Sequence, residues 1–341
     1  MKPESISVVV TCHNLERYIG LAIESVLNQD FRGPVEVVVI DDCSTDRSAA
    51  IIKTHRNVRY LRPEQNLGVL MATVLGLENS TGELVFFLDG DDMWEPSKLS
   101  TVVERFRGDH RLALVTHDLK FIDSSGHLLD QKSRPEEVMA TVPSSREDAI
   151  TRDGILLHSD YVWLGSAYAV RRSLSNLEGF CTFAKVLSDP FNTYQDWPLA
   201  FWVACQPQVS FGYVNLKLFR YRLHGANHSG DATSVAKAVR NFRRSRNTLQ
   251  AINKIAVRFA VDTRVQRVTR QKLGLYSYLV ELYAGNRWRA AKGFLANLPN
   301  LITGTASFWK ETARFVGVQI FGVERFISLT RATKKSRVRA P

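Results

Sequence analysis

Apolar runs of strand length alternate with helical patterns along the first part of the chain. Three runs, in "ISVVVTCHN", "EVVVIDDCSTD" and "ELVFFLDGDD", are continuous and rich in β-branched or aromatic residues. Runs of this kind are typical of strands that are buried on both faces of a parallel sheet. Between them, "LERYIGLAIESVLNQ", "TDRSAAIIKTH" and "NLGVLMATVLGLENS" are helix candidates. The alternation predicts an α/β fold with a doubly wound, mostly parallel sheet.

Polar side chains follow each of the three predicted strands. They are Thr11, His13 and Asn14 after the first, Asp41 and Asp42 after the second, and Asp89, Asp91 and Asp92 after the third. In open α/β sheets, ligands bind beyond the carboxyl ends of the strands, so we expect these groups to line one site. No G-x-G-x-x-G or P-loop pattern follows any of these strands. The sequence therefore argues against an NAD(P) site or a Walker-type nucleotide site.

Three carboxylates lie within four residues at the end of the third strand: Asp89, Asp91 and Asp92. Their negative charges repel one another. Two carboxylates about 4 Å apart repel each other by roughly 4 kcal/mol at an effective dielectric constant near 20. Mg²⁺ or Mn²⁺, which binds one or two carboxylates together with substrate phosphates, would offset this repulsion. The alternative is a solvated turn in which an aspartate caps the next helix.

A second acidic pair, Asp41 and Asp42, occupies the corresponding place on the neighbouring strand. A carboxylate there can accept hydrogen bonds from a nucleoside base or from ribose hydroxyls. The alternative is a helix-capping arrangement with Ser44 and Thr45, which serves structure alone.

Cysteine usage and apolar run lengths indicate a cytoplasmic protein. The four cysteines are far apart and lack the spacing of a metal site, which predicts reduced thiols. The first apolar run is too short for a signal peptide or a membrane span. The longest uncharged run, 197–216, contains two prolines and several polar residues, so we do not interpret it as a transmembrane helix.

Charge divides the chain into two parts near residue 231. Residues 1–231 hold 23 Lys and Arg against 30 Asp and Glu, a net charge of −7, whereas residues 232–341 hold 22 against 4, a net charge of +18. We therefore predict one domain over 1–231 and a basic helical region over 232–341.

The basic region contains apolar residues at helical spacing. Trp309, Ala313, Val316, Ile320, Val323 and Ile327 recur at intervals of four and three, which predicts an apolar helical stripe. Basic amphipathic helices with Trp and Phe suit anionic membrane surfaces. Nucleic acid would attract the same charge, but no recognised nucleic-acid-binding module is present, so we expect no such partner. Packing on the first domain, or oligomer formation, is the alternative.

Four segments resemble family 2 glycosyltransferases in order and spacing: "SVVVTCHNLERYIGLAIESVLNQ", "VVVIDDCSTDRS", "GLENSTGELVFFLDGDDMWEPSKL" and "YRLHGANHS", with "NLGV" between the second and the third. The resemblance implies a GT-A fold, with a nucleotide-sugar half over about 1–110 and an acceptor half over about 111–231. It implies metal-dependent, inverting transfer of a sugar from a nucleotide diphosphate donor, most often of the UDP type. The implied acceptor is a hydroxyl of a glycan or lipid-linked molecule in cell-surface polysaccharide synthesis, at the inner face of the membrane.

The resemblance also assigns roles to residues of this chain. Those expected to border the nucleotide are Thr11, His13, Glu16, Asp41, Asp42 and Asp89, with Asp42 favoured for the base. Those expected to hold Mn²⁺ or Mg²⁺ are Asp91, Asp89 and Asp92, with Asp91 the direct ligand. Those expected at the diphosphate are Arg222 and His224, and those expected at the acceptor are Gly165, Ser166, Gln195 and Trp197.

The implied catalytic base is Asp196 in "TYQDWPLAFW". Inverting transfer requires a carboxylate to remove the proton from the acceptor hydroxyl. The alternative is a helix-start carboxylate that is favoured by the helix dipole. The chain departs from the family pattern at Gln195, where a Glu is usual, and at Thr73 and Val74, where an Arg and an Asn are usual.

Two other functions use similar residues. A non-catalytic protein that binds nucleotide sugars is one, and Gln195 is the feature that favours it. A nucleotidyltransferase, which would release pyrophosphate, is the other.

Overall fold

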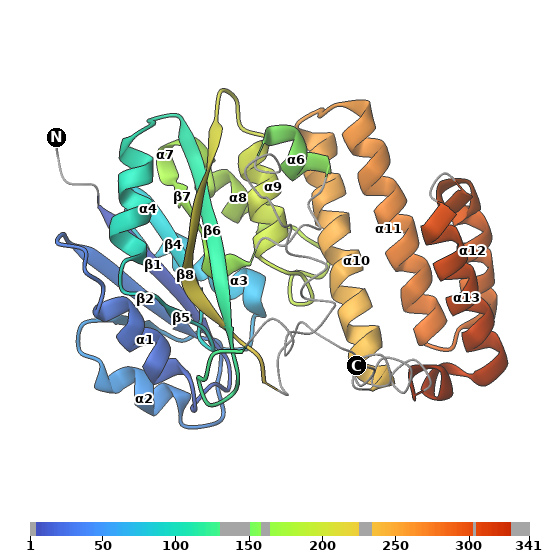
Figure 1. Ribbon diagram of the computed structural model, residues 1–341, viewed down its shortest axis with the longest axis horizontal. Coiled ribbons are helices and arrows are strands. Elements are labelled where there is room, and N and C mark those ends of the chain that lie inside the picture. Colours follow the sequence, from blue (N-terminus) through green and yellow to red (C-terminus); the bar gives the residue numbers. More distant parts are fainter. Residues whose placement is uncertain (1–4, 130–150, 158–163, 225–233, 303–304, 329–341) are drawn as a thin grey trace. The chain divides into compact units, whose positions relative to one another are not determined.

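The chain forms two compact units, Met1–Asn227 and His228–Pro341, in a computed structural model (Figure 1). The structure describes residues 5–129, 151–157, 164–224, 234–302 and 305–328; the side chains of residues 300–310 are not described.

A mixed sheet forms the centre of the first unit. Its described strands are β1 (Ile6–Cys12), β2 (Val35–Asp41), β3 (Arg59–Leu61), β4 (Leu84–Asp89), β5 (Met93–Trp94), β6 (Leu112–Ile122), β7 (Tyr168–Arg171) and β8 (Ser210–Arg222). Their order in the sheet is β3-β2-β1-β4-β7-β6-β8-β5. The strands β3, β2, β1 and β4 run parallel, and β7 is antiparallel to both of its neighbours. The predicted α/β fold with a doubly wound, mostly parallel sheet is confirmed.

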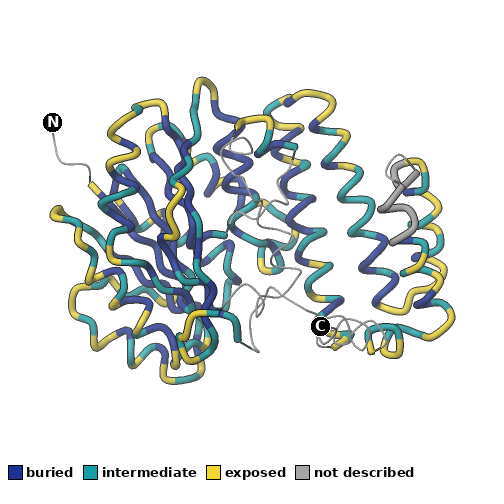
Figure 2. The backbone as a smooth tube through the Cα atoms, viewed as in Figure 1, coloured by how far each residue is buried: buried dark blue, intermediate teal, exposed yellow. Residues whose placement is uncertain are grey.

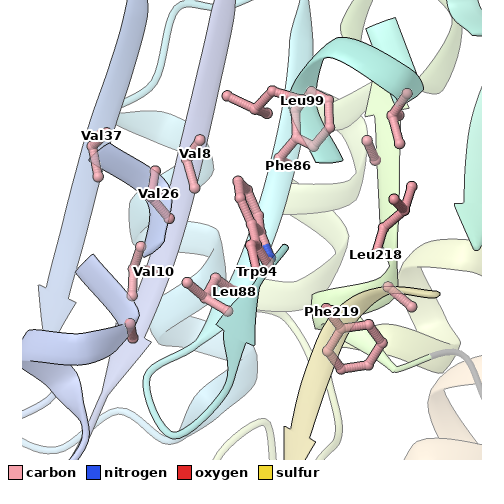
Figure 3. Packing of buried hydrophobic residues seen from close by; sticks show 14 of the residues in the cluster. Val8, Val10, Val26, Val37, Phe86, Leu88, Trp94, Leu99, Leu218 and Phe219 are labelled. Carbon is pink, nitrogen blue, oxygen red and sulfur yellow. The ribbon is translucent and has the colours of Figure 1, made fainter. Parts of the chain in front are cut away.

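Helices cover both faces of the parallel strands. The described helices of this unit are α1 (Ile19–Leu27), α2 (Ser48–Thr54), α3 (Val69–Glu78), α4 (Lys98–Arg107), α6 (Arg152–Leu157), α7 (Arg172–Ser175), α8 (Leu177–Lys185) and α9 (Asp196–Ala204). Val8 and Val10 point into a core shared with α1 and α4 (Figure 3), whereas Val9 faces α3 at Gly76. The sequences of these strands are continuous apolar runs because both faces of each strand are buried.

The register of the sheet brings the polar strand ends together. Thr11 on β1 pairs with Asp89 on β4, and Cys12 pairs with Asp41 on β2. The carboxyl ends of three parallel strands therefore meet at one edge, which fixes the position of the candidate site.

The second unit is helical over its described residues. It contains α10 (Val235–Arg258), α11 (Thr263–Tyr283), α12 (Arg287–Ile302) and α13 (Thr305–Phe321), and it has its own core around Tyr278, Leu282 and Val318. Within the described part of the chain, no helix has both the length and the apolar character needed to cross a membrane.

The predicted apolar stripe over 309–327 is wrong in two respects. The helix ends at Phe321 because Gly322 has a φ of 74°, and helical residues resume at 323–328. The stripe also does not form one face: Ala313, Val316 and Ile320 are exposed, whereas Val323 and Ile327 pack against the core around Tyr278. The side chain of Trp309 lies outside the described residues.

Gly68, which precedes α3, requires glycine for two reasons. Its φ of 76° and ψ of 161° are in a region that is almost restricted to glycine, and a Cβ atom would lie 2.5 Å from the carbonyl oxygen of Phe191. Gly285 has a similar φ of 79° but no atom within 4 Å of a Cβ atom. We expect Gly285→Ala to cost about 1–2 kcal/mol of unfolding free energy, as a positive φ alone does.

We expect Gly68→Ala to cost clearly more, because it adds the clash with Phe191 to the backbone strain. Differential scanning calorimetry of the two variants measures both costs. Equal losses would show that the contact with Phe191 does not constrain this turn.

Candidate active site

Asp89, at the end of β4, connects three elements of the first unit. Its Oδ1 atom accepts hydrogen bonds from Thr11 Oγ1 of β1 and from Gln195 Nε2 before α9, both at 3.2 Å. Its backbone N–H donates to Ser166 Oγ at 3.0 Å, in the short helix η1 (Gly165–Ala167). The carboxylate is therefore held where β1, β4, η1 and α9 meet.

The hydrogen bond from Gln195 brings the next residue, Asp196, into the same acidic environment. Burial, together with the charge of Asp89, raises the pKa of Asp196 to about 8. Burial, together with the charge of Asp91, raises the pKa of Asp89 to about 7. Both side chains are only partly buried, so solvent and ligands reach them. The site thus contains two carboxyl groups that titrate near neutral pH.

These shifts make the stability of the fold depend on pH. Because the folded pKa values of Asp89 and Asp196 are raised, the folded chain binds protons more tightly than the unfolded chain between about pH 4 and pH 8. The stability from these two groups is therefore fully present near pH 4, and it is lost as the pH rises through 7 and 8.

Asp92 is buried beneath the turn that carries Asp89 and Asp91. Its side-chain oxygens accept hydrogen bonds from Ser166 Oγ at 2.7 Å and from the Arg222 backbone N–H at 3.0 Å. Only 2% of the residue is exposed. Asp92 therefore does not fit its expected role as a metal ligand, because both oxygens serve internal contacts.

Lys98, at the start of α4, supplies a positive group beneath this turn. It is fully buried, and its Nζ atom donates to the Ser166 backbone oxygen at 2.5 Å and lies 4.1 Å from the centre of the Trp94 ring. Burial lowers the pKa of Lys98, and the charge of Asp92 opposes that change. The Lys98 amine and the π-face of Trp94 thus lie together beneath the acidic turn.

Asp91 is the more accessible member of a pair with His224. His224 Nε2 lies 3.0 Å from Asp91 Oδ2, and the side chains of His224 and Asp91 are 7% and 21% exposed, respectively. The His224 ring packs on the ring of Tyr18 at 5.0 Å between centroids, with the two planes tilted by 41°. These two contacts hold the imidazole beside the carboxylate.

Arg222 does not fit its expected contact with the donor's diphosphate. It is 1% exposed, and its guanidinium donates to the backbone oxygens of Asp91 at 2.8 Å and Asp123 at 3.2 Å. Its Cζ atom lies 4.7 Å from the centre of the Tyr18 ring. Arg222 is therefore a structural residue that holds the acidic turn and Tyr18 together.

The residues present fit a divalent cation that is bound in part by its substrate. Among the described residues, no group of three or more His, Cys, Asp and Glu side chains is arranged to hold a metal ion. Asp91 is nevertheless partly accessible and offers a carboxylate, the ligand type that suits Mg²⁺ and Mn²⁺, and His224 lies beside it. Mg²⁺ and Mn²⁺ sites of this kind obtain their remaining ligands from phosphates and water.

Asp41 and Asp42 lie at the end of β2 with different partners. Asp41 is fully buried; although burial raises its pKa, hydrogen bonds from Ser44, Tyr60 and Arg62 hold it below the usual value. Asp42 is 4% exposed and accepts backbone hydrogen bonds from Leu67 at 2.7 Å and Gly68 at 2.9 Å. Both carboxylates therefore shape the loops beside β2.

The remaining nucleotide-side residues lie on the loop after β1. His13 Nδ1 is 2.7 Å from the backbone oxygen of Asp42, and Asn66 Nδ2 is 3.2 Å from the His13 ring. Glu16 accepts a hydrogen bond from the Arg47 backbone at 3.0 Å. These contacts join the loop after β1 to the loops after β2 and β3.

The expected acceptor residues divide into buried and accessible ones. Gly165 and Ser166 are buried, and the Ser166 hydroxyl lies between the backbone N–H of Asp89 and the carboxylate of Asp92, so its side chain is not available to an acceptor. Gln195 is 6% exposed, whereas Trp197 is partly accessible and packs on Tyr194.

Two buried residues of the site were missed in the sequence. Lys98 shares one face of α4 with Val102 and Phe106, at intervals of four, and its place in this apolar stripe is the signal that could have revealed it. Tyr168 donates from its hydroxyl to the Asp196 backbone oxygen at 3.3 Å, and burial raises its pKa. No sequence pattern marks Tyr168.

Removing the buried ammonium tests the role of Lys98. Lys98→Met retains the length of the side chain but removes the hydrogen bond to the Ser166 backbone oxygen and the charge near Asp92, so the free energy of unfolding should fall. Asp92→Asn should recover part of this loss in the double variant, with a coupling of about 0.5–3 kcal/mol in urea denaturation. Lys120→Met, which removes a partly exposed lysine paired with Glu95, is the control and should cost less than about 1 kcal/mol. Strictly additive losses for Lys98 and Asp92 would contradict the interaction.

Comparisons with known proteins agree on one family. The model of "Glycosyl transferase family 2" matches residues 7–172. An uncharacterized glycosyltransferase of Nostoc sp. is 30% identical over 272 residues, which cover 76% of this chain and 78% of that protein. The poly(ribitol-phosphate) β-N-acetylglucosaminyltransferase TarS of Staphylococcus aureus is 32% identical over 125 residues, 35% of this chain and 22% of that protein.

Solved structures agree on the fold. Residues 1–349 of S. aureus TarS in complex with UDP-GlcNAc match with a TM-score of 0.54 and 17% identity, covering 85% of this chain and 89% of that one. The mannosyltransferase PcManGT of Pyrobaculum calidifontis, in complex with GDP-Man and Mn²⁺, matches with a TM-score of 0.53 and 16% identity, covering 98% and 88%. The chain belongs to glycosyltransferase family 2 and is a glycosyltransferase with the GT-A fold.

Proposed function

We propose that this glycosyltransferase moves a sugar, with inversion, from a nucleoside diphosphate donor to a hydroxyl group of a glycan or lipid-linked acceptor. The observation that carries the proposal is the hydrogen bond from Gln195 to Asp89, which joins the helix start bearing Asp196 to the acidic strand end. UDP is the preferred nucleotide, with support from the TarS complex with UDP-GlcNAc.

Asp196 acts as the catalytic base. Its carboxylate takes the proton of the acceptor hydroxyl, and the acceptor oxygen forms a bond to the anomeric carbon of the donor sugar. The bond from that carbon to the phosphate oxygen breaks at the opposite face, so the configuration inverts and a nucleoside diphosphate leaves. A raised pKa makes Asp196 a stronger base than an ordinary aspartate.

The donor lies over the polar ends of β1, β2 and β4. Thr11, His13, Glu16 and Asp89 border the nucleotide, and Asp41 and Asp42 support it through the loops that they shape. Asp91, with Asp89 beside it, would hold Mn²⁺ or Mg²⁺, and His224, 3.0 Å from Asp91, would contact the diphosphate. When bound, the cation neutralises charge on the leaving diphosphate, and the Mn²⁺ complex of PcManGT supports this assignment.

The acceptor belongs to cell-surface polysaccharide synthesis. The name of TarS, which describes transfer to a poly(ribitol-phosphate), supports this class. In this proposal residues 1–231 are the catalytic domain, and the basic region 232–341 binds an anionic surface at the inner face of the membrane. Trp197, beside Asp196 and partly accessible, contacts the acceptor.

Replacing the proposed base tests the reaction. Asp196→Asn keeps the size of the side chain but removes its basicity, so we expect transfer to fall by about 10²–10⁴-fold. The assay measures nucleoside diphosphate release and product in the presence of Mn²⁺, and calorimetry should show donor binding retained. Asp109→Asn, which replaces a carboxylate remote from the acidic turn, is the control and should leave transfer unchanged. Full activity of Asp196→Asn, or release of pyrophosphate, would contradict the proposal.

The pH dependence of transfer gives an independent test. Because the base acts in its ionised form and its pKa is about 8, kcat/KM should rise as the pH increases from 6 and should level off above 8. An ordinary aspartate would give a flat profile over this range. Initial rates at limiting donor and acceptor distinguish the two cases.

A further inference from the structure

The outward face of α12 carries large apolar side chains in solvent. Trp288 is 89% exposed and Leu295 is 62% exposed. At 3.6 residues per turn, Trp288, Lys292 and Leu295 lie within about 60° around the helix. The opposite face of α12 buries Ala290 and Asn297. The exposed apolar residues are therefore not a by-product of a helix that is loosely packed.

The neighbouring helix, α13, shows the same arrangement. Val316 is 44% exposed and Ile320 is 66% exposed, whereas Val318 is buried in the same core cluster as Tyr278 and Leu282. The backbone of the helical unit includes buried, intermediate and exposed segments (Figure 2). Phe294 of α12 and Phe315 of α13 stack with their ring centroids 4.8 Å apart, so the two helices share one core while both present apolar residues to solvent. A folded core on one side and exposed Trp, Leu, Val and Ile on the other indicate a surface that binds something.

Basic residues surround this surface. Arg287, Arg289 and Lys292 of α12 are all exposed. Residues 234–328 contain 17 Lys and Arg against 4 Asp and Glu. The partner is therefore anionic, and a second copy of this chain is disfavoured because both copies would carry the same charge.

An anionic bilayer combines the two properties that this surface requires. Tryptophan favours the depth of the lipid headgroups, where its ring is partly apolar and partly hydrated. Lysine and arginine gain attraction from anionic headgroups, and helices that lie in the interface place apolar residues at the boundary of the acyl chains. A phosphate-rich polymer would bind the basic side chains but would leave Leu295 exposed to water.

We propose that the outward face of α12 is the surface that docks this glycosyltransferase on an anionic lipid bilayer. Trp288 and Leu295 enter the headgroup layer, and Arg287, Arg289 and Lys292 contact the anionic headgroups. Val316 and Ile320 of α13 add apolar area. This inference rests on the proposed membrane association of the basic region and is independent of the transfer chemistry.

The full chain offers matched controls for a vesicle flotation experiment. Vesicles of phosphatidylcholine with 30% phosphatidylglycerol are compared with pure phosphatidylcholine. The contribution of apolar contact is tested with the double variant Trp288→Ser/Leu295→Ser. Its control is Val257→Ser, because Val257 of α10 is also exposed, at 61%. The contribution of charge is tested with a triple variant in which Arg287, Arg289 and Lys292 are all replaced by Gln. Its control is the triple variant in which Arg264, Arg267 and Arg270, which are also exposed, are replaced by Gln. The two triple variants remove the same net charge.

We expect the wild type to float only with the anionic vesicles. Loss of three headgroup contacts should lower the partition coefficient by about 100-fold for the α12 triple variant, since each charge near the surface contributes about five-fold. The Trp288 and Leu295 variant should lose at least ten-fold, and both controls should stay within a few-fold of wild type. Donor hydrolysis should be unchanged in every variant, because none of these residues belongs to the catalytic site.

Several outcomes would overturn the proposal. Equal losses for the two triple variants would show diffuse attraction and not a surface on α12. Failure of the wild type to float would overturn the membrane association itself, while activity and the pH profile would still test the transferase separately. Wild-type self-association that the Trp288 and Leu295 variant abolishes would assign the surface to a second copy of the chain.

Discussion

Asp92 and Lys98 are buried beneath the turn that carries Asp89 and Asp91, and the geometry of the catalytic site depends on the hydrogen bonds that both residues make with Ser166. Placing acidic side chains close together is unfavourable unless positive groups or hydrogen bonds compensate. Lys98 and the Arg222 guanidinium lie under the turn, and Ser166 joins its layers by hydrogen bonds to Asp89, Asp92 and Lys98. These contacts from beneath the turn help to hold Asp89 and Asp91 at the edge of the sheet.

In this arrangement the carboxyl groups of Asp89 and Asp196 change protonation near neutral pH. The raised pKa values of Asp89 and Asp196 reduce the stability of the fold as the pH rises, but they give a base that is effective near neutral pH. Gln195 adds no further negative charge to this site. Its amide donates a hydrogen bond to Asp89, whereas a glutamate at this position would add another carboxylate to the cluster. The departure from the family pattern is therefore compatible with catalysis.

The sequence was sufficient to predict the sheet and the edge at which the site lies, because the three apolar runs are long and each ends in polar residues. It was not sufficient to separate ligand-facing residues from buried ones. Arg222 and Ser166 have the chemistry of binding residues, but tertiary packing turns both inward. Lys98 was hidden because a lysine in an amphipathic helix is normally solvated.

The helical region shows a related limit. Apolar residues occur on more than one side of the segment 313–321, so spacing alone did not reveal which side faces the core. The positive φ of Gly322, which ends α13, also depends on the folded backbone. Val316 and Ile320 of the predicted stripe are exposed, whereas Val323 and Ile327 pack against the core.

We expect the repulsion between the carboxylates of Asp89 and Asp91 to persist until the donor and a divalent cation bind. Carboxyl ¹³C NMR of aspartate-labelled protein, with Asp89→Asn to assign the signal, measures this directly. The account predicts a pKa of about 7 for Asp89 in the free protein, and a clear fall toward the ordinary aspartate range with UDP and Mg²⁺. An ordinary pKa in the free protein, or a raised pKa that does not change on binding, would contradict it.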